Sequence, residues 1–427
     1  MNVTTDPALR SFISVAEHSH FPIQNLPYGI FKPNALSKPR VGVAIGDLIL
    51  DLSILEAEGI FADILGKPSY IFSKPNLNSF MSQGLNIWRE TRAVISNLLR
   101  VDEPQLRDND NLRQQTLIPI QEARLMMPVE IGGYTDFYSS REHATNVGTM
   151  FRGKENALMP NWLHLPVAYH GRTSSIVLSG TDIHRPLGQS KSDEAVSPTF
   201  GPSKLLDFEL EMGFFIGSGN KLSQPIPVTE TENHIFGLVL VNDWSARDIQ
   251  KWEYQPLGPF LAKNFATSIS PWVVTLEALE PFRCAGPPQD PQPLPYLVSQ
   301  GDQSFDIELE VSLQSPEMEI EHVICRSNFR YLYWSMRQQL AHHSISGCNL
   351  QTGDLLASGT ISGPDPKSYG SMLELAWRGT KPIQLPDGTS RKFIADNDRV
   401  IMRGWCAGDG YRVGFGEVIG KILPAKI

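Results

Sequence analysis

Four carboxylates are the side chains of this sequence whose types and spacing best fit chemistry. They are Asp136, Glu209, Glu211 and Asp243. In the segment 205–212 (LLDFELEM) apolar and acidic residues alternate with period two, so in a strand both glutamates leave the same face of the sheet. Neighbouring carboxylates repel each other unless water or a cation lies between them. Ligands that are all oxygen favour a hard ion, Ca²⁺ or Mg²⁺, over zinc.

The same spacing occurs a second time in the chain. The segment 305–311 (FDIELEV) carries Glu308 and Glu310 on an equally regular alternation. A Glu-x-Glu step on an amphipathic strand is commonly its solvated face. The local pattern therefore does not decide which glutamate pair binds a metal.

The residues around Asp136 supply a candidate general base. The segment 134–143 (YTDFYSSREH) places carboxylate, phenol, guanidinium and imidazole groups in one stretch that is too polar for a core. We interpret His143 as the base because these polar and ionisable side chains lie next to it in the sequence. The adjacent His342 and His343 have a structural explanation, since imidazolium at the end of a helix interacts favourably with the helix dipole.

The composition excludes several classes of protein. The chain has 427 residues, 41% of them hydrophobic, and a net charge of −9. An acidic protein lacks the basic face that nucleic acid or an anionic membrane requires, so we expect neither partner. No apolar run approaches the length of a membrane span. The four cysteines form no C-x-x-C pair, and the first residues lack an apolar signal segment, which together predict a cytoplasmic protein.

The pattern of elements predicts a mainly β fold in two parts. Segment 41–52 reads as a tight hairpin turning at Gly46, as in a small SH3-like barrel, followed by a helix over 78–100 and a charged connector over 101–118. We therefore assign an N-terminal SH3-like domain to residues 1–118 and a larger catalytic domain, an antiparallel β-sandwich or roll, to 119–427. One helix, capped by Ser327 and ending near His343, is expected in the second domain. Its strands are predicted at 205–216, 235–242, 305–313, 372–377, 398–403 and 412–422.

Several common chemistries are not indicated. The sequence contains no phosphate-binding loop, no G-x-G-x-x-G, no H-E-x-x-H, and no nucleophile elbow. A metal acting together with an acid–base residue is the interpretation that remains.

Five segments give the chain a specific resemblance. They are 136–143 (DFYSSREH), 151–156 (FRGKEN), 242–248 (NDWSARD), 256–261 (PLGPFL) and 353–363 (GDLLASGTISG). The sequence resembles the fumarylacetoacetase family from about Phe12 to its C-terminus. The resemblance implies a metal-dependent hydrolase that cleaves a carbon–carbon bond of 4-fumarylacetoacetate to fumarate and acetoacetate, the last step of tyrosine and phenylalanine breakdown. It also implies Ca²⁺ or Mg²⁺ as cofactor, a small dicarboxylate substrate and a homodimer.

The resemblance also assigns roles by position, and it favours Glu209 and Glu211 over the second glutamate pair. It implies a base at His143 oriented by Glu374, with Arg247, Gln250 and Lys263 stabilising the oxyanion. The implied metal-site residues are Asp136, Glu209, Glu211, Asp243, Lys263 and Thr267. The implied substrate contacts are Tyr138, Arg152, Tyr169, Gln250, Tyr254 and Thr360.

Two alternatives stay open at this point. Within the superfamily the chain could be an acylpyruvate hydrolase or a decarboxylase, which usually lack the N-terminal domain; turnover of the two substrates would decide. From another class, it could be a noncatalytic scaffold whose small barrel binds partners. The presence of both His143 and Glu374 argues against a scaffold.

Overall fold

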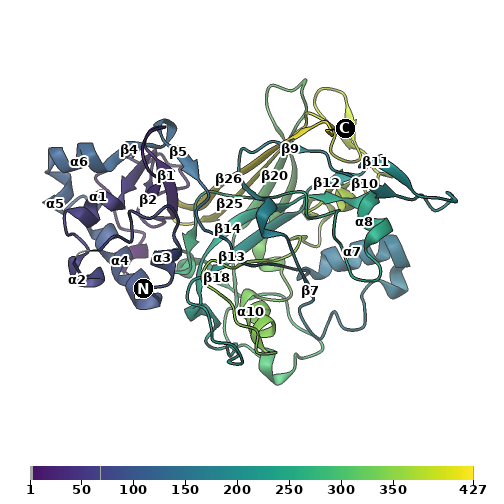
Figure 1. The fold of residues 1–427 in the computed structure, drawn as a ribbon, viewed down its shortest axis with the longest axis horizontal. Helices are drawn as coiled ribbons and strands as arrows, with labels where there is room; N and C mark the ends of the chain where they lie inside the picture. The colour runs from purple at the N-terminus through teal and green to yellow at the C-terminus, as the bar shows by residue number, and fades with distance from the viewer. Residues whose placement is uncertain (1–2, 68, 427) are drawn as a thin grey trace.

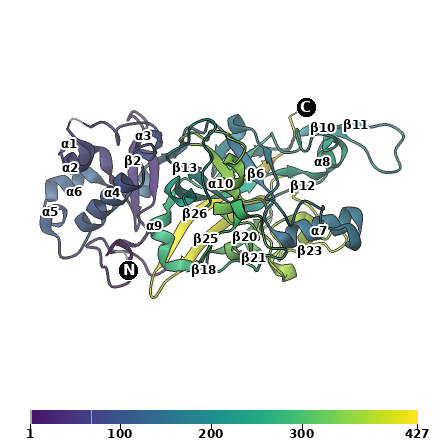
Figure 2. The same ribbon diagram turned by 90° about the horizontal axis from the view of Figure 1, so that it is seen from below.

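The computed structural model describes residues 3–67 and 69–426. The N-terminal part and the hairpin of β10 (Leu187–Ser190) and β11 (Thr199–Pro202) lie at opposite ends of the molecule, with the large sheets between them (Figures 1 and 2). The fold is mainly β, as predicted, and its first part is a small, curved five-stranded sheet.

The N-terminal sheet has the strand order β4-β3-β2-β1-β5, with every pair antiparallel. The predicted hairpin is confirmed: β2 and β3 are joined at Gly46, whose φ of 54° suits glycine in a two-residue turn. The strands are β1 (Tyr28–Lys32), β2 (Arg40–Ile45), β3 (Leu48–Asp51), β4 (Leu117–Pro119) and β5 (Arg124–Met126).

The helices of this part differ from the prediction in two places. The helix expected over 78–100 is broken into two because Gly84 has a φ of 87°, which no helix residue adopts. The segment 101–118 is not a bare connector, since it folds into two short helices and β4 and buries Leu106 and Leu112. The helices are α1 (Leu52–Ala57), α2 (Ala62–Leu65), α3 (Asn78–Met81), α4 (Leu85–Leu98), α5 (Pro104–Arg107) and α6 (Asp110–Thr116).

The C-terminal part is built on an eight-stranded and a five-stranded sheet. The first has the order β7-β6-β22-β13-β14-β16-β8, with β17 also paired to β14, and the second has the order β21-β20-β25-β26-β9. Both are mixed rather than purely antiparallel, because β6–β22, β8–β16 and β9–β26 are parallel pairs. The strands of the first sheet are β6 (Tyr134–Phe137), β7 (Ala168–His170), β8 (Ile176–Leu178), β13 (Leu210–Ile216), β14 (Ile235–Asp243), β16 (Thr267–Ile269), β17 (Val274–Thr275) and β22 (Leu355–Ala357). Those of the second are β9 (Ile183–His184), β20 (Glu308–Gln314), β21 (His322–Asn328), β25 (Arg399–Ala407) and β26 (Arg412–Leu423).

Two-stranded ribbons and short helices complete this part. The ribbons are β10 (Leu187–Ser190) with β11 (Thr199–Pro202), β12 (Leu206–Asp207) with β15 (Ser245–Ala246), β18 (Arg283–Cys284) with β19 (Ser304–Phe305), and β23 (Ile383–Gln384) with β24 (Ser390–Arg391). The helices are α7 (Arg141–Arg152), α8 (Arg247–Glu253), α9 (Leu276–Leu279), α10 (Met336–Ser344) and α11 (Met372–Leu375).

Two predictions in this part were wrong. The helix that ends near His343 is capped by Ser335, not Ser327, because Ser335 forms a capping box with Gln338 while Ser327 lies in β21. The expected strand at 372–377 is instead the short helix α11, capped by the side chain of Ser371.

The central strands of the eight-stranded sheet are buried on both faces. Along β13 and β14, alternate side chains such as Phe215 and Val239 join the N-terminal core, while Phe214 and Leu238 join the C-terminal core. This explains why both strands are almost continuously apolar. The predicted division at residue 118 stays a proposal; the N-terminal sheet itself extends to β5.

His20 connects the N-terminal segment to the C-terminal sheet. Its Nδ1 accepts a hydrogen bond from the Gly416 N–H at 3.2 Å, so it must be unprotonated there. Burial and the nearby charges of Arg412 and Arg403 lower the pKa of His20 from 6.5 to about 4. The native state thus holds this imidazole neutral at pH values where an unfolded chain protonates it.

This contact predicts an acid-dependent loss of stability. As the pH falls from about 6.5 to about 4 the unfolded state binds a proton that the native state excludes, so the free energy of unfolding should fall, by up to about 3 kcal/mol. His20→Gln, which keeps an acceptor without titrating, should remove this slope. Urea unfolding across that pH range tests it, with the exposed His18→Gln as control. The same slope in both variants would contradict the prediction.

Candidate active site

The four carboxylates predicted from the sequence come together in one buried cluster. Asp136 lies on β6, Glu209 and Glu211 lie just before and within β13, and Asp243 ends β14. One ligand oxygen from each lies within 4.8 Å of the others, and all four residues are buried. The alternation of 205–212 places both glutamates on this side of the sheet while Phe208 and Leu210 face the core.

The second glutamate pair lies elsewhere. Glu308 is exposed on β20, and Glu310 pairs with Arg326 at 3.0 Å. These side chains form the solvated face of their strand. Of the two Glu-Leu-Glu segments, the structure brings only 209 and 211 into the cluster.

Two cations and a hydroxyl hold part of the cluster. Lys263 Nζ contacts Glu209 and lies 2.6 Å from Asp243 Oδ2. Arg247 Nη2 donates to Glu209 Oε1 at 2.7 Å, and Thr267 donates to Asp243 Oδ1 at 2.7 Å. Burial opposes the ionisation of Glu209, but Arg247 and Lys263 outweigh it and hold its pKa below the ordinary range.

The remaining carboxylates lack such neutralisation. Burial and the neighbouring Asp243 raise the pKa of Asp136 well above its ordinary value. Burial and the charge of Asp136 do the same for Glu211. Within the described part of the chain, Asp136 Oδ1 and both oxygens of Glu211 are buried without a hydrogen-bond partner. Buried acceptors without donors, all of them hard oxygens, are what a Ca²⁺ or Mg²⁺ ion would complete, so these residues fit such an ion.

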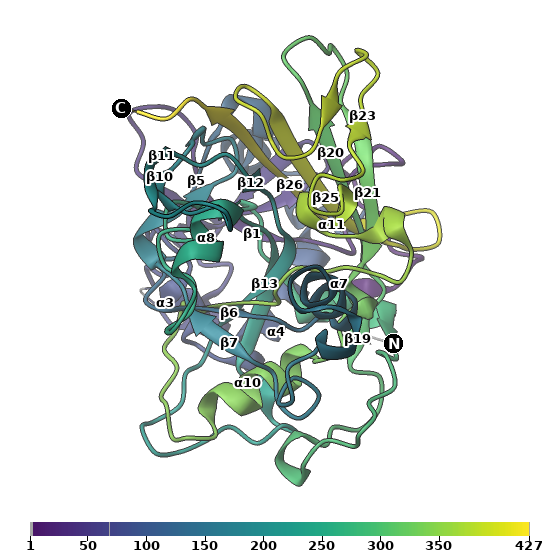
Figure 3. The same cartoon turned by 90° about the vertical axis from the view of Figure 1, so that its right-hand side faces the viewer.

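His143 and Glu374 form a second buried pair beside this cluster. The His143 Nδ1 lies 2.6 Å from Glu374 Oε2, and the two side chains are 3% and 0% exposed. His143 occupies the first turn of α7, and Glu374 lies in α11, which packs next to α7 (Figure 3). Desolvation opposes the charge of Glu374, but His143 and nearby donors outweigh it and lower the pKa of this carboxyl.

Three further polar side chains hold Glu374, and sequence reasoning missed all of them. Asn146 donates to Oε1 at 2.9 Å, while Ser362 and Ser371 donate to Oε2 at 3.0 and 2.8 Å. Ser371, three residues before a glutamate, has the spacing of a helix cap and could have been found. No local pattern indicates Asn146 or Ser362.

The other predicted site residues lie around the carboxylate cluster and the His143–Glu374 pair, and some of them are buried while others are exposed. Tyr169 OH donates to Asp243 Oδ2 at 2.7 Å, and Gln250 accepts from Arg247 at 3.1 Å. The Tyr138 ring stands edge-on to His143 with centroids 5.1 Å apart. Arg152 is exposed and donates to the carbonyls of Asn156 and Ala157. Tyr254 is also exposed, whereas Thr360 is buried.

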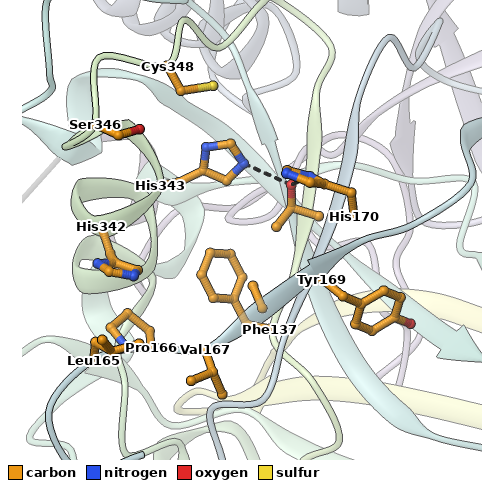
Figure 4. A pocket seen from close by; sticks show the side chains of 12 residues that line it. Phe137, Leu165, Pro166, Val167, Tyr169, His170, His342, His343, Ser346 and Cys348 are labelled. Carbon is orange, nitrogen blue, oxygen red and sulfur yellow. Dashed lines mark hydrogen bonds between the residues drawn. The ribbon is translucent and has the colours of Figure 1, made fainter. Parts of the chain in front are cut away.

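A cavity of about 390 Å³ lies on the reverse side of β6 and β7 from the carboxylates. The Thr135 hydroxyl lies 2.8 Å from His343 Nε2 and 3.3 Å from His170 Nδ1. The hydroxyl of Tyr169 points away from these histidines (Figure 4). Neighbouring residues of a strand face opposite sides, so Thr135 faces the cavity and Asp136 faces the cluster. The cavity and the carboxylate cluster therefore lie on opposite faces of β6 and β7, and Tyr169 borders both.

Comparison with known families identifies the chain's relatives. Residues 24–128 match the model of the fumarylacetoacetase N-terminal region, and residues 133–422 match that of the fumarylacetoacetate hydrolase C-terminal region. The chain belongs to the fumarylacetoacetase family. It is 60% identical to the fumarylacetoacetase of Bos taurus over 415 residues, covering 97% of this chain and 99% of that one. It is 59% identical to the Homo sapiens enzyme over 417 residues, covering 98% and 99%.

A solved structure shares the fold of this fumarylacetoacetase-family chain. The fumarylacetoacetate hydrolase of Exiguobacterium antarcticum superposes with a TM-score of 0.52 at 15% identity, covering 94% of this chain and 100% of that one. At this identity the likeness concerns the fold alone. Among the described residues, no helix combines the length and apolar character needed to cross a membrane.

Glu211→Gln should affect the protein in opposite directions with and without metal. Without metal it removes one of the repelling buried carboxylates, so the melting temperature should rise by several degrees. With Ca²⁺ or Mg²⁺ it removes a ligand charge, so affinity should fall at least about tenfold. Calorimetric melting and titration with each ion test both effects.

Glu308→Gln, on the exposed face of β20, is the matched control and should change neither quantity. Equal loss of ion affinity in the two variants would show that the cluster is not the metal site.

Proposed function

We propose that this chain hydrolyses the carbon–carbon bond of 4-fumarylacetoacetate, giving fumarate and acetoacetate. The observation that carries the proposal is the His143–Glu374 pair beside a buried cluster of oxygen ligands, in a chain that matches fumarylacetoacetases over nearly its whole length. Cleavage of such a bond by water needs a base, an oxyanion site and a way to stabilise a carbanion leaving group.

The cluster would hold Ca²⁺ or Mg²⁺ through Asp136, Glu209, Glu211 and Asp243, with Lys263 and Thr267 bonded to these ligands. When bound, a divalent cation supplies electrophilic stabilisation of the oxygens of a 1,3-dicarbonyl group. The proposed cofactor is therefore one hard divalent ion.

His143 is proposed to take the proton from water. Its Nδ1 donates to the Glu374 carboxylate, which leaves Nε2 as the acceptor and fixes the ring's orientation. Glu374 stabilises the imidazolium that forms when the proton arrives. Asn146 and two serine hydroxyls keep the carboxylate in place.

Different side chains are proposed to contact the oxyanion and the rest of the substrate. Lys263, Arg247 and Gln250 present donors at the edge of the cluster and are proposed to stabilise the tetrahedral oxyanion. Arg152 is exposed at the end of α7, near enough for its charge to act on Tyr138, and suits a substrate carboxylate. The further proposed substrate contacts are Tyr138, Tyr169, Gln250, Tyr254 and Thr360.

We also propose a homodimer in the cytoplasm. Large apolar side chains are exposed on the β10–β11 hairpin, whose first strand contacts α8, and on the segment that follows α8, among them Phe200 at 74%, Leu257 at 96% and Phe260 at 68%. Such a surface fits a second copy of the chain. The four cysteines are free thiols, which suits a reducing compartment.

Purified protein should consume fumarylacetoacetate and lose that activity in a strong chelator. Removal of the ion leaves no electrophile for the dicarbonyl group, and added Mg²⁺ or Ca²⁺ should restore the rate. Loss of the substrate's absorbance measures it, with an acylpyruvate as the competing substrate. Faster turnover of the acylpyruvate, or full activity in metal-free protein, would contradict the proposal.

His143→Ala and Glu374→Gln should not have additive effects. His143→Ala should lower kcat by about 10³-fold or more with metal binding intact, and Glu374→Gln by a similar or smaller factor. Because the two act as one unit, the double variant should be about as slow as His143→Ala alone. Single-turnover rates measure this. Multiplying losses would mean that another group activates the water.

Leu257→Glu should convert the dimer into a monomer, because it places a charge in the centre of an apolar contact. Light scattering after size exclusion measures the mass. Leu36→Glu, at a residue 98% exposed in the N-terminal part, is the control and should leave the mass unchanged. A wild-type monomer, or a Leu257→Glu dimer, would overturn the assignment of this surface.

A further inference from the structure

Asp207 is a fully buried carboxylate that contacts two separate parts of the site. It ends β12, two residues before Glu209, and is 0% exposed. Its Oδ1 accepts from the Met372 N–H at 2.7 Å, and its Oδ2 accepts from the Leu373 N–H at 3.1 Å. Arg247 Nε donates to the same Oδ2 at 2.8 Å.

The first two contacts fix the turn that carries Glu374. Met372 and Leu373 open α11, and Glu374 follows directly. A carboxylate on these two amides holds the four-residue helix against β12, because so short a helix has few internal hydrogen bonds to hold it. The position of the His143 partner is therefore set from outside α11.

The third contact fixes the arginine that holds a carboxylate of the cluster. Arg247 gives Nε to Asp207, Nη2 to Glu209 at 2.7 Å and Nη1 to Gln250 at 3.1 Å. The guanidinium is planar, so a partner on Nε fixes the direction of the other two arms. The backbone joins the same two regions, because Glu209 forms an isolated β-bridge with Ser371, the residue before α11.

We propose that Asp207 is a positioning residue for the hydrolysis, setting the place of the His143–Glu374 pair relative to Arg247 and Glu209. The proposal rests on the roles given to these residues under the proposed function. Asp207 is 0% exposed and its two oxygens accept from three protein donors, so we place it behind the groups that would contact substrate or ion. It acts through the groups it holds, as residues behind metal ligands and bases do.

Asp207→Asn removes this function with little change of shape. An asparagine has one acceptor oxygen, so its amide N–H₂ must face either the Met372 N–H, in place of Oδ1, or both the Leu373 N–H and the Arg247 Nε–H, in place of Oδ2, and donors then oppose each other. We expect kcat to fall by about 10- to 100-fold while KM changes by less than about threefold. Affinity for Ca²⁺ should weaken as well, because Glu209 loses its fixed partner.

Asp398 provides a matched control for a purely structural effect. It is also 0% exposed, accepts from Arg391 Nε and Nη2 at 2.8 and 2.9 Å, and accepts from the Ala395 N–H at 2.9 Å. Asp398→Asn should lose similar stability, yet its kcat per folded molecule should stay within about twofold of the wild type. The folded fraction is taken from circular dichroism of the full chain.

Asp207→Glu covers the case in which Asp207→Asn fails to fold. It keeps the charge and both acceptor oxygens but moves them by one methylene, so kcat should still fall at nearly constant KM. Wild-type kcat in a folded Asp207→Asn or Asp207→Glu variant would overturn the proposal. Equal losses in the Asp207 and Asp398 variants would do the same.

A combination with Glu374→Gln separates this proposal from the one it rests on. Asp207→Asn should slow the Glu374→Gln enzyme much less than it slows the wild type, because part of what it positions is already lost. Full activity of Glu374→Gln alone would contradict the proposed base pair. A fall of kcat in Glu374→Gln, together with wild-type kcat in Asp207→Asn, would contradict only the role of Asp207.

Discussion

Repulsion between buried carboxylates is the constraint on which the rest of this structure depends. Four of them place oxygens within 4.8 Å of one another. In the described residues Lys263 and Arg247 pair with Glu209 and Asp243, which leaves Asp136 and Glu211 without a cationic partner. Keeping these two buried groups ionised is unfavourable, which is why their pKa values are raised, so the arrangement does not serve the stability of the fold. The proposed divalent cation among the oxygens would offset this cost.

The fold meets this constraint by fixing each carboxylate on a strand or directly before one, and the position of each strand is set independently. β13 and β14 are packed by a hydrophobic core on each face, so Glu211 and Asp243 do not separate when they repel. The proposed base His143 and its partner Glu374 lie outside these strands, on α7 and α11, and need their own supports. Asp207 and Arg247 link the carboxylate cluster to the helix that carries Glu374.

Much of this was predictable from the sequence, for physical reasons that particular residues show. Period-two alternation placed Glu209 and Glu211 on one face, and the turn at Gly46 gave the hairpin. Alternation did not separate them from Glu308 and Glu310, because local pattern carries no information about what lies across the sheet. The resemblance to the family favoured Glu209 and Glu211, and the tertiary structure places only this pair among other carboxylates.

The errors arose where tertiary contacts override a local pattern. The apolar run after Ser371 resembles a strand, but Asp207, 165 positions away, accepts from its first amides and stabilises a helix. Ser327 and Ser335 both suit a helix cap, and the choice follows from Gln338, which completes the capping box. The partners of Glu374 come from three separate segments, which no local spacing can predict.

The central claim is that the four carboxylates hold one hard divalent cation. Anomalous scattering from crystals of the full chain grown with Mn²⁺, a hard ion that oxygen ligands accept, tests it most directly. We predict one strong peak among Asp136, Glu209, Glu211 and Asp243, about 2.0–2.5 Å from their oxygens. An active enzyme with no peak there, or with its only peak beside the histidines of the cavity behind β6, would contradict it.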